Sequence, residues 1–505
     1  MYFYFRFLYF LVFISLSGSI LIAQNTRSVQ VVNADILEIA KTPEGELLRK
    51  LVGNVVLQQD TTFLFCDSAY YFTERNFIEA YSKVKILIGK NISIQGDKLS
   101  YDGNSRIAEL YHNVLLTHKH NQLKTHRLTY YRAEGYAVYR EGGTLSDSEN
   151  ELSSKQGYYY TRSKIAYFYQ KVVMKGKNFQ LTTDSLKYIF PEKKAIFIAP
   201  TFITTTDNQE IYTERGHYLS TQKEAFLYQN SILKDSTYTI KADTIFYQDS
   251  LQKGWFHCAV SIRRDSSLSV YGERAWLDRK LKELKITENS YLVYYFAKDT
   301  LVLFGDTLYS RYDTLNRYQR LRAYPTVRLT FGSVLAIADS LEYNFRDSTL
   351  KLMQDPVLWS ENYQLSGDTI ILFFRGNTLD SLVIPSNSWG IQQEDSVFFN
   401  QIKAKTLIAK LRQNQIYYLY LNGNCESIYI VKDGSKYLGL NKSLSKEMKI
   451  FFRENKPSRV VFMQKPQATF FPIYQVWKKN HLLPGFEWRQ NEKPSYYLGS
   501  KALAN

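Results

Sequence analysis

The chain has 505 residues, of which 45% are hydrophobic and 22% are charged, and its formal net charge at pH 7 is +16. This balance excludes an intrinsically disordered chain. The 41 tyrosines and 31 phenylalanines, set against 11 prolines, favour β structure. The basic residues are spread through the chain without an arginine-rich cluster, so we expect no nucleic-acid partner, whereas another anionic partner is compatible with the charge.

The first 23 residues are apolar apart from Arg6. The apolar run from Phe7 to Ile22 is short for a membrane-spanning helix, and the Ala23-Gln24 step offers a cleavage point. We therefore predict a secretory signal peptide over residues 1–23. An uncleaved anchor is the alternative, because Leu21 is bulky for the position three before the cut.

A repeat occupies residues 24–383, and its clearest copy is Ile-Ser-Ile-Gln-Gly-Asp-Lys-Leu-Ser-Tyr at residues 92–101. If the Asp of this copy is taken as a marker, the marker positions recur about every 30 residues, a period typical of stacked repeats. The marker positions are Asp35, Asp67, Asp97, His126, Gln156, Asp184, Glu214, Asp243, Glu273, Asp306, Asp339 and Asp368.

The apolar residues of each unit alternate, which predicts a strand with one buried face. The alternation changes parity at the marker: Ile92 and Ile94 precede it at even positions, whereas Leu99 and Tyr101 follow it at odd positions. A bulge or corner at the marker returns both arms to the same side. A polar turn and a second alternating strand follow, so each unit is two bent strands that need neighbours to bury their apolar face. The predicted fold class is all-β, an elongated stack of two-strand repeats of about 30 residues.

The first units contain Ala-Asp ending at Asp35, Gly-Asn-Val ending at Val55, and Asp-Ser-Ala-x-Tyr ending at Tyr71, and later units look similar, as at Ser340-Leu-Glu-Tyr343. With these motifs the chain resembles, over roughly residues 31–380, the OstA-like family, the LptA-type periplasmic proteins of lipopolysaccharide transport. The resemblance implies a stacked β-jellyroll that encloses an apolar groove for acyl chains. It also implies a location in the periplasm of a Gram-negative bacterium.

The same resemblance implies lipopolysaccharide, through its lipid A part, as the ligand. Other jellyroll-containing transport proteins of the inner and outer membranes are the implied partners, joined by edge-strand pairing. The edge near Val31–Ile39 is the one we expect to be available for this pairing. The chain departs from shorter family members by its many more units, and the family supplies no catalytic residues.

Inward positions of the repeat are the candidates for lining a lipid-binding groove. They are Ile94, Leu99, Tyr101, Leu110, Leu116, Leu181, Leu186, Tyr188, Phe197, Ile240, Ile245, Tyr247, Phe256, Leu341 and Tyr343. The alternative is that they fill a solid core, which would make the chain a structural envelope scaffold or adhesin. A polysaccharide-active enzyme is a third hypothesis, but no catalytic pattern and no cofactor motif is found in the sequence, so we expect no enzyme activity.

Histidines and cysteines give no predicted metal site. His118 and His120 share a strand face, but no Cys or carboxylate completes a set nearby in sequence, so we expect solvated histidines. Cys66 and Cys258 occupy strand positions and are expected to be small buried residues.

The period loosens after Asp368. For residues 384–465 we predict a loop over 384–396 and then further atypical β repeats, with markers at Lys405 and Lys446. Residues 466–505 have no period and are predicted to form a C-terminal cap or docking extension, since the terminal units of repeat proteins are atypical.

Overall fold

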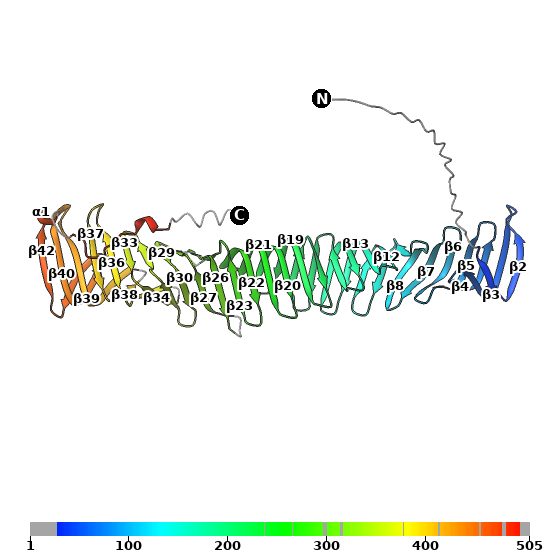
Figure 1. Ribbon diagram of the computed structural model, residues 1–505, viewed down its shortest axis with the longest axis horizontal. Helices are drawn as coiled ribbons and strands as arrows, with labels where there is room; N and C mark the ends of the chain where they lie inside the picture. The colour runs from blue at the N-terminus through cyan, green and yellow to red at the C-terminus, as the bar shows by residue number, and fades with distance from the viewer. Residues whose placement is uncertain are drawn as a thin grey trace, which may run out of the picture. The chain divides into compact units, whose positions relative to one another are not determined.

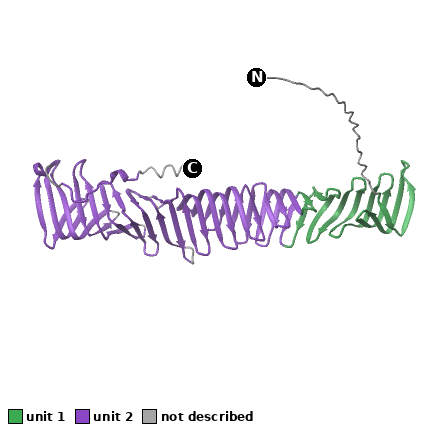
Figure 2. Cartoon of the chain, viewed as in Figure 1, with its two compact units in different colours: residues 1–148, 155–163 green, residues 149–154, 164–505 purple. Residues whose placement is uncertain are grey.

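The computed structural model describes residues 28–494 apart from 237, 265, 296–299, 314–316, 377, 413–414, 454–455 and 477–480. These residues contain 42 β-strands, one short α-helix and one 3-10 helix. The chain forms two compact units, residues 1–148 with 155–163 (unit 1) and residues 149–154 with 164–505 (unit 2), shown in Figure 2. The predicted all-β fold class is confirmed, whereas the predicted signal peptide lies outside the described residues.

Unit 1 contains eleven of the described strands, which lie side by side (Figure 1). They are β1 Gln30–Asn33, β2 Ile36–Lys41, β3 Leu47–Gln59, β4 Thr62–Phe72, β5 Phe77–Ile88, β6 Ile92–Asp102, β7 Ile107–His118, β8 Asn121–Tyr131, β9 Tyr136–Tyr139, β10 Gly143–Ser146 and β12 Gln156–Tyr160.

Unit 2 begins with β11 Glu151–Ser154 and continues from β13 onward. Its first strands are β13 Ile165–Lys175, β14 Phe179–Ile189, β15 Lys194–Phe197, β16 Thr201–Thr205, β17 Glu210–Thr213, β18 Arg215–Leu219, β19 Glu224–Lys234, β20 Thr239–Gln248, β21 Lys253–Arg264, β22 Leu268–Asp278, β23 Glu283–Thr287, β24 Tyr291–Tyr295, β25 Thr300–Phe304, β26 Thr307–Tyr312, β27 Tyr318–Tyr324 and β28 Val327–Phe331.

The remaining strands of unit 2 lead into two short helices. They are β29 Val334–Ala338, β30 Ser340–Asn344, β31 Thr349–Met353, β32 Val357–Ser360, β33 Tyr363–Ser366, β34 Thr369–Arg375, β35 Thr378–Ile384, β36 Ser388–Gln393, β37 Phe399–Ala404, β38 Thr406–Arg412, β39 Gln415–Asp433, β40 Lys436–Arg453, β41 Lys456–Met463 and β42 Gln467–Pro472, followed by α1 Ile473–Val476 and the 3-10 helix η1 Gln490–Glu492. No helix among the described residues is long and apolar enough to cross a membrane.

Each long strand bends at a corner that contains the marker. In the antiparallel pair β5–β6, Val84 faces Gly96 and Tyr81 faces Lys98, so the marker between them is skipped by the ladder. The buried positions of β6 change parity there, because Ile94 precedes the skipped residue and Leu99 follows it, and neither side chain is exposed. This is the predicted corner, and it places both arms of the strand on the same interior.

Two consecutive residues with left-handed backbone lie opposite the marker in the neighbouring strand. In β5 these are Ser82 (φ 63°) and Lys83 (φ 50°), and the Ser82 hydroxyl donates a 2.6 Å hydrogen bond to Asp67. That bond, together with the nearby Lys83 ammonium, lowers the pKa of Asp67 below its usual value. Asn113 (φ 51°) donates in the same way to Asp97 at 2.7 Å. A left-handed non-glycine residue costs about 1–2 kcal/mol, and these bonds offset part of that cost.

The corner of later units interrupts the strand. Asp306 lies between β25 and β26, Asp339 between β29 and β30, and Asp368 between β33 and β34. Asn387 and Ser386 donate hydrogen bonds of 2.8–2.9 Å to the Asp368 carboxylate and lower its pKa. The marker therefore keeps its role where the ladder breaks into separate strands.

The described part of residues 384–494 corrects one expectation and refines two others. The predicted loop over 384–396 is wrong in part, because it contains the strand β36, which pairs with β33 and β37. Lys405 lies between β37 and β38, and Lys446 is skipped by the β39–β40 ladder, so both occupy corner positions. In the C-terminal extension, β42 pairs with β40, and residues 481–494 then return along the preceding strands.

Candidate functional site: the apolar interior and its mouth

The corner divides the strands into two sets of arms that line one interior. Arms that meet in turns such as residues 103–106 are called A arms, and arms that meet in turns such as residues 89–91 and 119–120 are called B arms. The two sets of turns form the lips of a mouth opposite the corner.

Aligned apolar rows run across consecutive strands on the inner face of each set of arms. In unit 2 the A row is Leu227, Ile245, Phe256, Ala275, Ile286, Leu308, Ala323, Leu341, Leu352 and Ile370, and the B row is Leu233, Ile240, Ile262, Val270, Leu292, Leu303, Leu329, Ala336, Leu358 and Leu365. In unit 1 the B row is Leu57, Leu64, Ile86, Ile94, Leu116, Leu123 and Leu145.

Thirteen of the fifteen candidate groove residues are buried, and Tyr247 and Tyr343 are half-buried. Leu99 and Ile245 expose none of their surface, so the two sets of arms pack against each other at these positions. The interior in this structure is thus closely packed at the candidate residues. Whether they contact a lipid stays a proposal.

Polar side chains bridge the mouth in unit 1. Asp60, in the B turn after β3, forms ion pairs with Arg106 (3.2 Å) and Arg132 (3.4 Å) on the A side. Gln59 accepts a short hydrogen bond from the Tyr101 hydroxyl and donates to the carbonyl of Gly103 at 2.9 Å. Burial raises the pKa of Tyr101, which keeps this hydroxyl protonated.

The same unit has a second bridge at the B turn after β7. His118 Nδ1 and the hydroxyl of Tyr159 are 2.8 Å apart, and Asn121 Nδ2 donates to the same hydroxyl at 3.3 Å. The expectation that His118 is solvated is wrong, because only 6% of its surface is exposed. The buried imidazole of His118 therefore has the hydrogen-bond partner that a buried polar group requires.

Unit 2 repeats this arrangement with other residues. Asn150 donates to the Tyr188 hydroxyl at 3.0 Å, next to an ion pair between Glu149 and Lys193. Further along, the Arg279 guanidinium lies 3.6 Å from the Asp235 carboxylate. Most of these bridges join residues that are 38–46 positions apart. Because the repeat is about 30 residues long, the two residues of a bridge are roughly one and a half repeats apart in the sequence.

Charge is divided between the lips in these ion pairs. The cations Arg106, Arg132, Lys193 and Arg279 stand on the A side, and the anions Asp60, Glu149 and Asp235 stand on the B side. Sequence reasoning missed this seam of mouth bridges, because the polar partners differ from unit to unit and carry no periodic signal. The mouth therefore presents cations that can bind an anionic group if the bridging carboxylates move away.

The remaining histidines and cysteines add no metal centre. His112 Nδ1 and His126 Nε2 lie 3.1 Å apart on the exposed corner, and the described residues hold no group of three or more side chains suited to a metal ion. Cys66 is buried, and desolvation raises its pKa to about 12. The expectation that Cys258 is buried is wrong: it is exposed, because its left-handed backbone (φ 61°) places it at a corner.

An outer hollow is a second candidate for a site. Tyr309, Arg322 and Glu342 form an outward row on the A arms and line a cavity of about 440 Å³ together with Tyr324 and Met353. The Arg322 guanidinium is paired with Glu342 at 2.7 Å. This hollow lacks convergent unpaired polar groups in the described lining, so the interior is the stronger candidate.

The first strands of unit 1 form a sheet edge with exposed apolar side chains. Strand β2 pairs with β3 along one side. Ile36, Leu37 and Ile39 of β2 are 60%, 48% and 64% exposed. Side chains of this kind at a strand edge suit pairing with another sheet, since they leave apolar area to cover.

Comparisons with known proteins match part of the chain. The model of the OstA-like protein family matches residues 26–184 and 170–243. No curated protein matches the chain. Among solved structures, a match is LptH from Pseudomonas aeruginosa, described as the LptA homologous periplasmic component of the conserved lipopolysaccharide transport device; the identity is 13%, the match covers 28% of this chain and 80% of that one, and the TM-score is 0.17. Residues 26–243 of the chain are therefore similar to the OstA-like protein family.

Proposed function

We propose that this chain binds lipopolysaccharide in the periplasm and moves it toward the outer membrane through the interior between its A and B arms. The observation that carries the proposal is the unbroken succession of inward apolar rows, matched across strand after strand in each unit. The OstA-like match and the likeness to a family of lipopolysaccharide-transport proteins support the same function.

The energetics of a repeated apolar row suit a sliding ligand. Burying each CH₂ group contributes about 0.8 kcal/mol, so a lipid with several acyl chains gains ample affinity from such rows. Because this attraction has no direction and every unit offers the same surface, no single unit holds the lipid strongly.

Lipid entry requires the lips to separate, since the interior is packed at Leu99 and Ile245. Separation breaks the mouth bridges and frees cations such as Arg132 and Arg279. The phosphates of lipid A are suitable replacements for the lost carboxylate partners, because guanidinium groups bind both in bidentate fashion. Acyl chains would then contact the inward rows, while the phosphates stay at the mouth.

The ends of the array are proposed contacts with partner proteins. Strand β2 has the exposed edge and the exposed apolar side chains that edge pairing with another jellyroll needs. Replacing Ile36 by Pro removes one backbone donor from this edge. We expect weaker partner binding with an intact fold, measured by pull-down of the envelope transport components, and unchanged binding would argue against edge pairing.

Photo-crosslinking in cells that export lipopolysaccharide tests the binding itself. A photoreactive residue is placed at the inward positions Leu99, Ile245 and Leu341, with their outward neighbours Ser100, Phe246 and Glu342 as matched controls. We expect lipopolysaccharide adducts at the inward positions alone. Adducts at neither set would contradict lipid transport through the interior.

A second candidate function is that of an envelope scaffold with a solid core. The complete burial of Leu99, Leu110, Ile245 and Phe256 favours it, because these side chains already fill the space that acyl chains would occupy. Depletion of the protein distinguishes the two functions: a transport protein leaves lipopolysaccharide in the inner membrane, whereas loss of a scaffold does not.

A further inference from the structure

The outer face of the B arms near the end of unit 2 is apolar and buried, although an outer face normally meets solvent. The row Leu335, Trp359, Gln364, Ile391, Gln401 and Ile428 runs across β29, β32, β33, β36, β37 and β39. None of these six side chains exposes more than 3% of its surface. Something must cover this row, and from β33 to β39 residues 481–494 do so.

Two buried glutamines hold the backbone of this segment. Gln401 Nε2 donates to the carbonyl of His481 at 2.9 Å, and its Oε1 accepts from the amide of Leu483 at 2.8 Å. Gln364 Nε2 donates to the carbonyl of Glu487 at 2.8 Å, and its Oε1 accepts from the amide of Arg489 at 2.9 Å.

Each glutamine side chain thus donates a hydrogen bond to the carbonyl of one residue and accepts one from the amide of the residue two positions further on. A side-chain amide that makes this pair of bonds imitates a neighbouring β-strand. The same pair of hydrogen bonds recurs six residues further along the segment. The two glutamines therefore bind the backbone on either side of a turn, in which the amide of Phe486 donates to the carbonyl of Leu483 at 3.0 Å and Gly485 has a φ of 86°.

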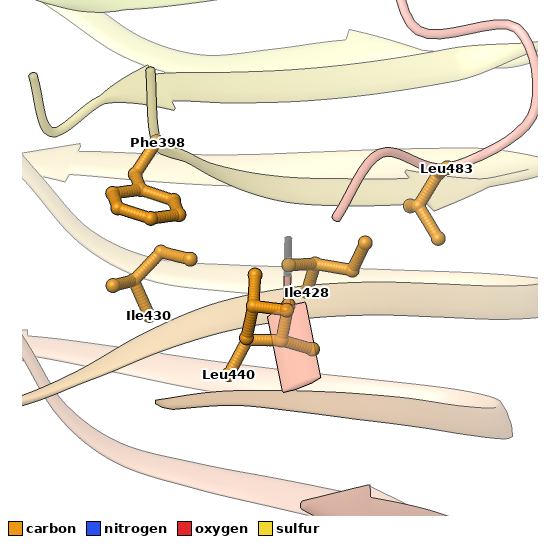
Figure 3. Packing of buried hydrophobic residues seen from close by; sticks show 6 residues of the cluster. Phe398, Ile428, Ile430, Leu440 and Leu483 are labelled. Carbon is orange, nitrogen blue, oxygen red and sulfur yellow. The ribbon is translucent and has the colours of Figure 1, made fainter. Parts of the chain in front are cut away.

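Side chains of the segment add apolar anchors. Leu483 packs into a cluster with Phe398, Ile428, Ile430 and Leu440, and Figure 3 shows it extending from the returning chain toward these strands. Phe486 and Trp488 lie against the ring of Phe399, with ring centroids 5.1 and 5.4 Å apart.

The far end of the segment is fixed by charge. The Arg489 guanidinium contacts Asp355 at 2.8 Å and Glu492 at 2.6 Å. In Figure 1 the red 3-10 helix η1, which follows Arg489, lies near the strands around β33 and away from β42. The segment is thus held by its backbone, by apolar side chains and by ion pairs, which are the kinds of contact that hold a bound peptide.

We propose that the outer face of the B arms from β32 to β39 is a docking site for a peptide segment, that residues 481–494 are its ligand within one chain, and that the same segment of a second copy can fill it. The segment forms no strand ladder with the sheet and is held by side chains of residues 355–440. A second copy offers an identical set of contacts, as in other exchanges of one element between identical chains.

The connection limits the geometry of the exchange. Five residue steps join Val476 of α1 to His481, and they span at most about 17 Å. A segment docked on a second copy therefore brings the C-terminal ends of two chains together. The proposal concerns these outer faces and does not depend on lipid transport through the interior.

A complementation experiment tests the exchange. The acceptor chain ends at Asn480, so its site is empty, and the donor is the full chain with Gln364→Ala and Gln401→Ala, so its own segment is released. We expect each chain alone to be monomeric and their mixture to form a 1:1 complex, measured by size-exclusion chromatography with light scattering. As matched control, the full chain with Gln180→Ala and Gln95→Ala, two exposed outer-face glutamines, keeps its segment docked and forms at least tenfold less complex.

Two results would overturn the proposal: folded donor and acceptor that do not associate, or a complex that persists when the donor also ends at Asn480. If the truncated acceptor fails to fold, the full chain with a protease site at residues 477–480 replaces it. After cleavage we expect a labelled peptide of residues 481–494 to displace the docked fragment. Retention of the fragment until the whole unit unfolds would show that the segment is an integral part of the fold and would also overturn the proposal.

Discussion

The B arms of unit 2 have buried inner faces both at β14–β20 and at β32–β39, but their outer faces differ in exposure. Inward residues are buried in both regions, as at Leu181 and Leu358. The outward residues Gln180 and Lys241 of the first region are exposed, whereas Trp359 in the second is completely buried. The outer face of the same repeat is therefore exposed to solvent in one region and covered by the segment 481–494 in the other.

The two faces of the repeat are therefore under different constraints. The inner face must be apolar in every unit, because neighbouring units bury it. The outer face is free to vary, and its residues change from polar to apolar where a returning segment covers it. The following predictions test that contrast, in order of decreasing effect.

Truncation of the outer face should be costly only where that face is covered. Trp359→Ala leaves a large void and is expected to lower the free energy of unfolding by about 3–5 kcal/mol. Lys241→Ala, on the exposed outer face, is expected to change it by less than about 0.5 kcal/mol. Chemical denaturation followed by circular dichroism measures both, and similar values for the two variants would remove the contrast.

Loss of a glutamine amide that binds the backbone of the docked segment should lower the free energy of unfolding by less than Trp359→Ala does. Gln364→Ala leaves the Glu487 carbonyl, the Arg489 amide and the Trp359 indole N–H without a bond. We expect destabilisation by about 1–3 kcal/mol. Gln180→Ala is the matched control in the other region and should be neutral. Equal effects in the same denaturation assay would count against the docked arrangement.

The ion pairs of the docked segment should contribute less to the free energy of unfolding than the glutamine hydrogen bonds do. Arg489→Ala breaks the contacts with Asp355 and Glu492, whose side chains are 76% and 46% exposed, so we expect a loss of about 0.5–1 kcal/mol. Lys234→Ala breaks the more exposed pair with Glu210 and should cost no more than about 0.5 kcal/mol. A larger loss for Lys234→Ala than for Arg489→Ala would reverse the predicted order.

Acid should loosen the docked segment slightly. Hydrogen bonding to Arg489 lowers the pKa of Glu492 below its ordinary value near 4.5, so this form binds fewer protons than one in which the contact between Arg489 and Glu492 is broken. The stabilisation is therefore complete above the ordinary value and is lost as the pH falls through the lowered one. Fluorescence of Trp488 should report this change in the wild type. In Glu492→Gln the part due to Glu492 should be absent, and an identical pH profile would contradict the assignment.

The inward residues could be predicted because each depends on its own strand. A period of two, reset at the marker, indicated Ile94, Leu99 and Ile245, and all three are buried. Tyr247 and Tyr343 follow the same pattern but are half-buried, whereas Tyr101 and Tyr188, at the same position of the repeat, are buried and hydrogen-bonded to Gln59 and Asn150. The mouth bridges could not be predicted, because Asp60 and Arg132 are 72 residues apart and neither position repeats in character.

Alternation and turn chemistry act within about 30 residues, so the all-β repeat, the corner at the marker and the inward residues can be inferred from the sequence alone. How closely the interior packs, which polar side chains bridge the mouth and what covers the outer face near β33 depend instead on residues far apart in the chain. Those features depend on contacts such as that of Gln364 with Arg489, which are 125 residues apart. The role of such a residue cannot be inferred from its neighbours in the sequence, because its partner reaches it only in the folded chain.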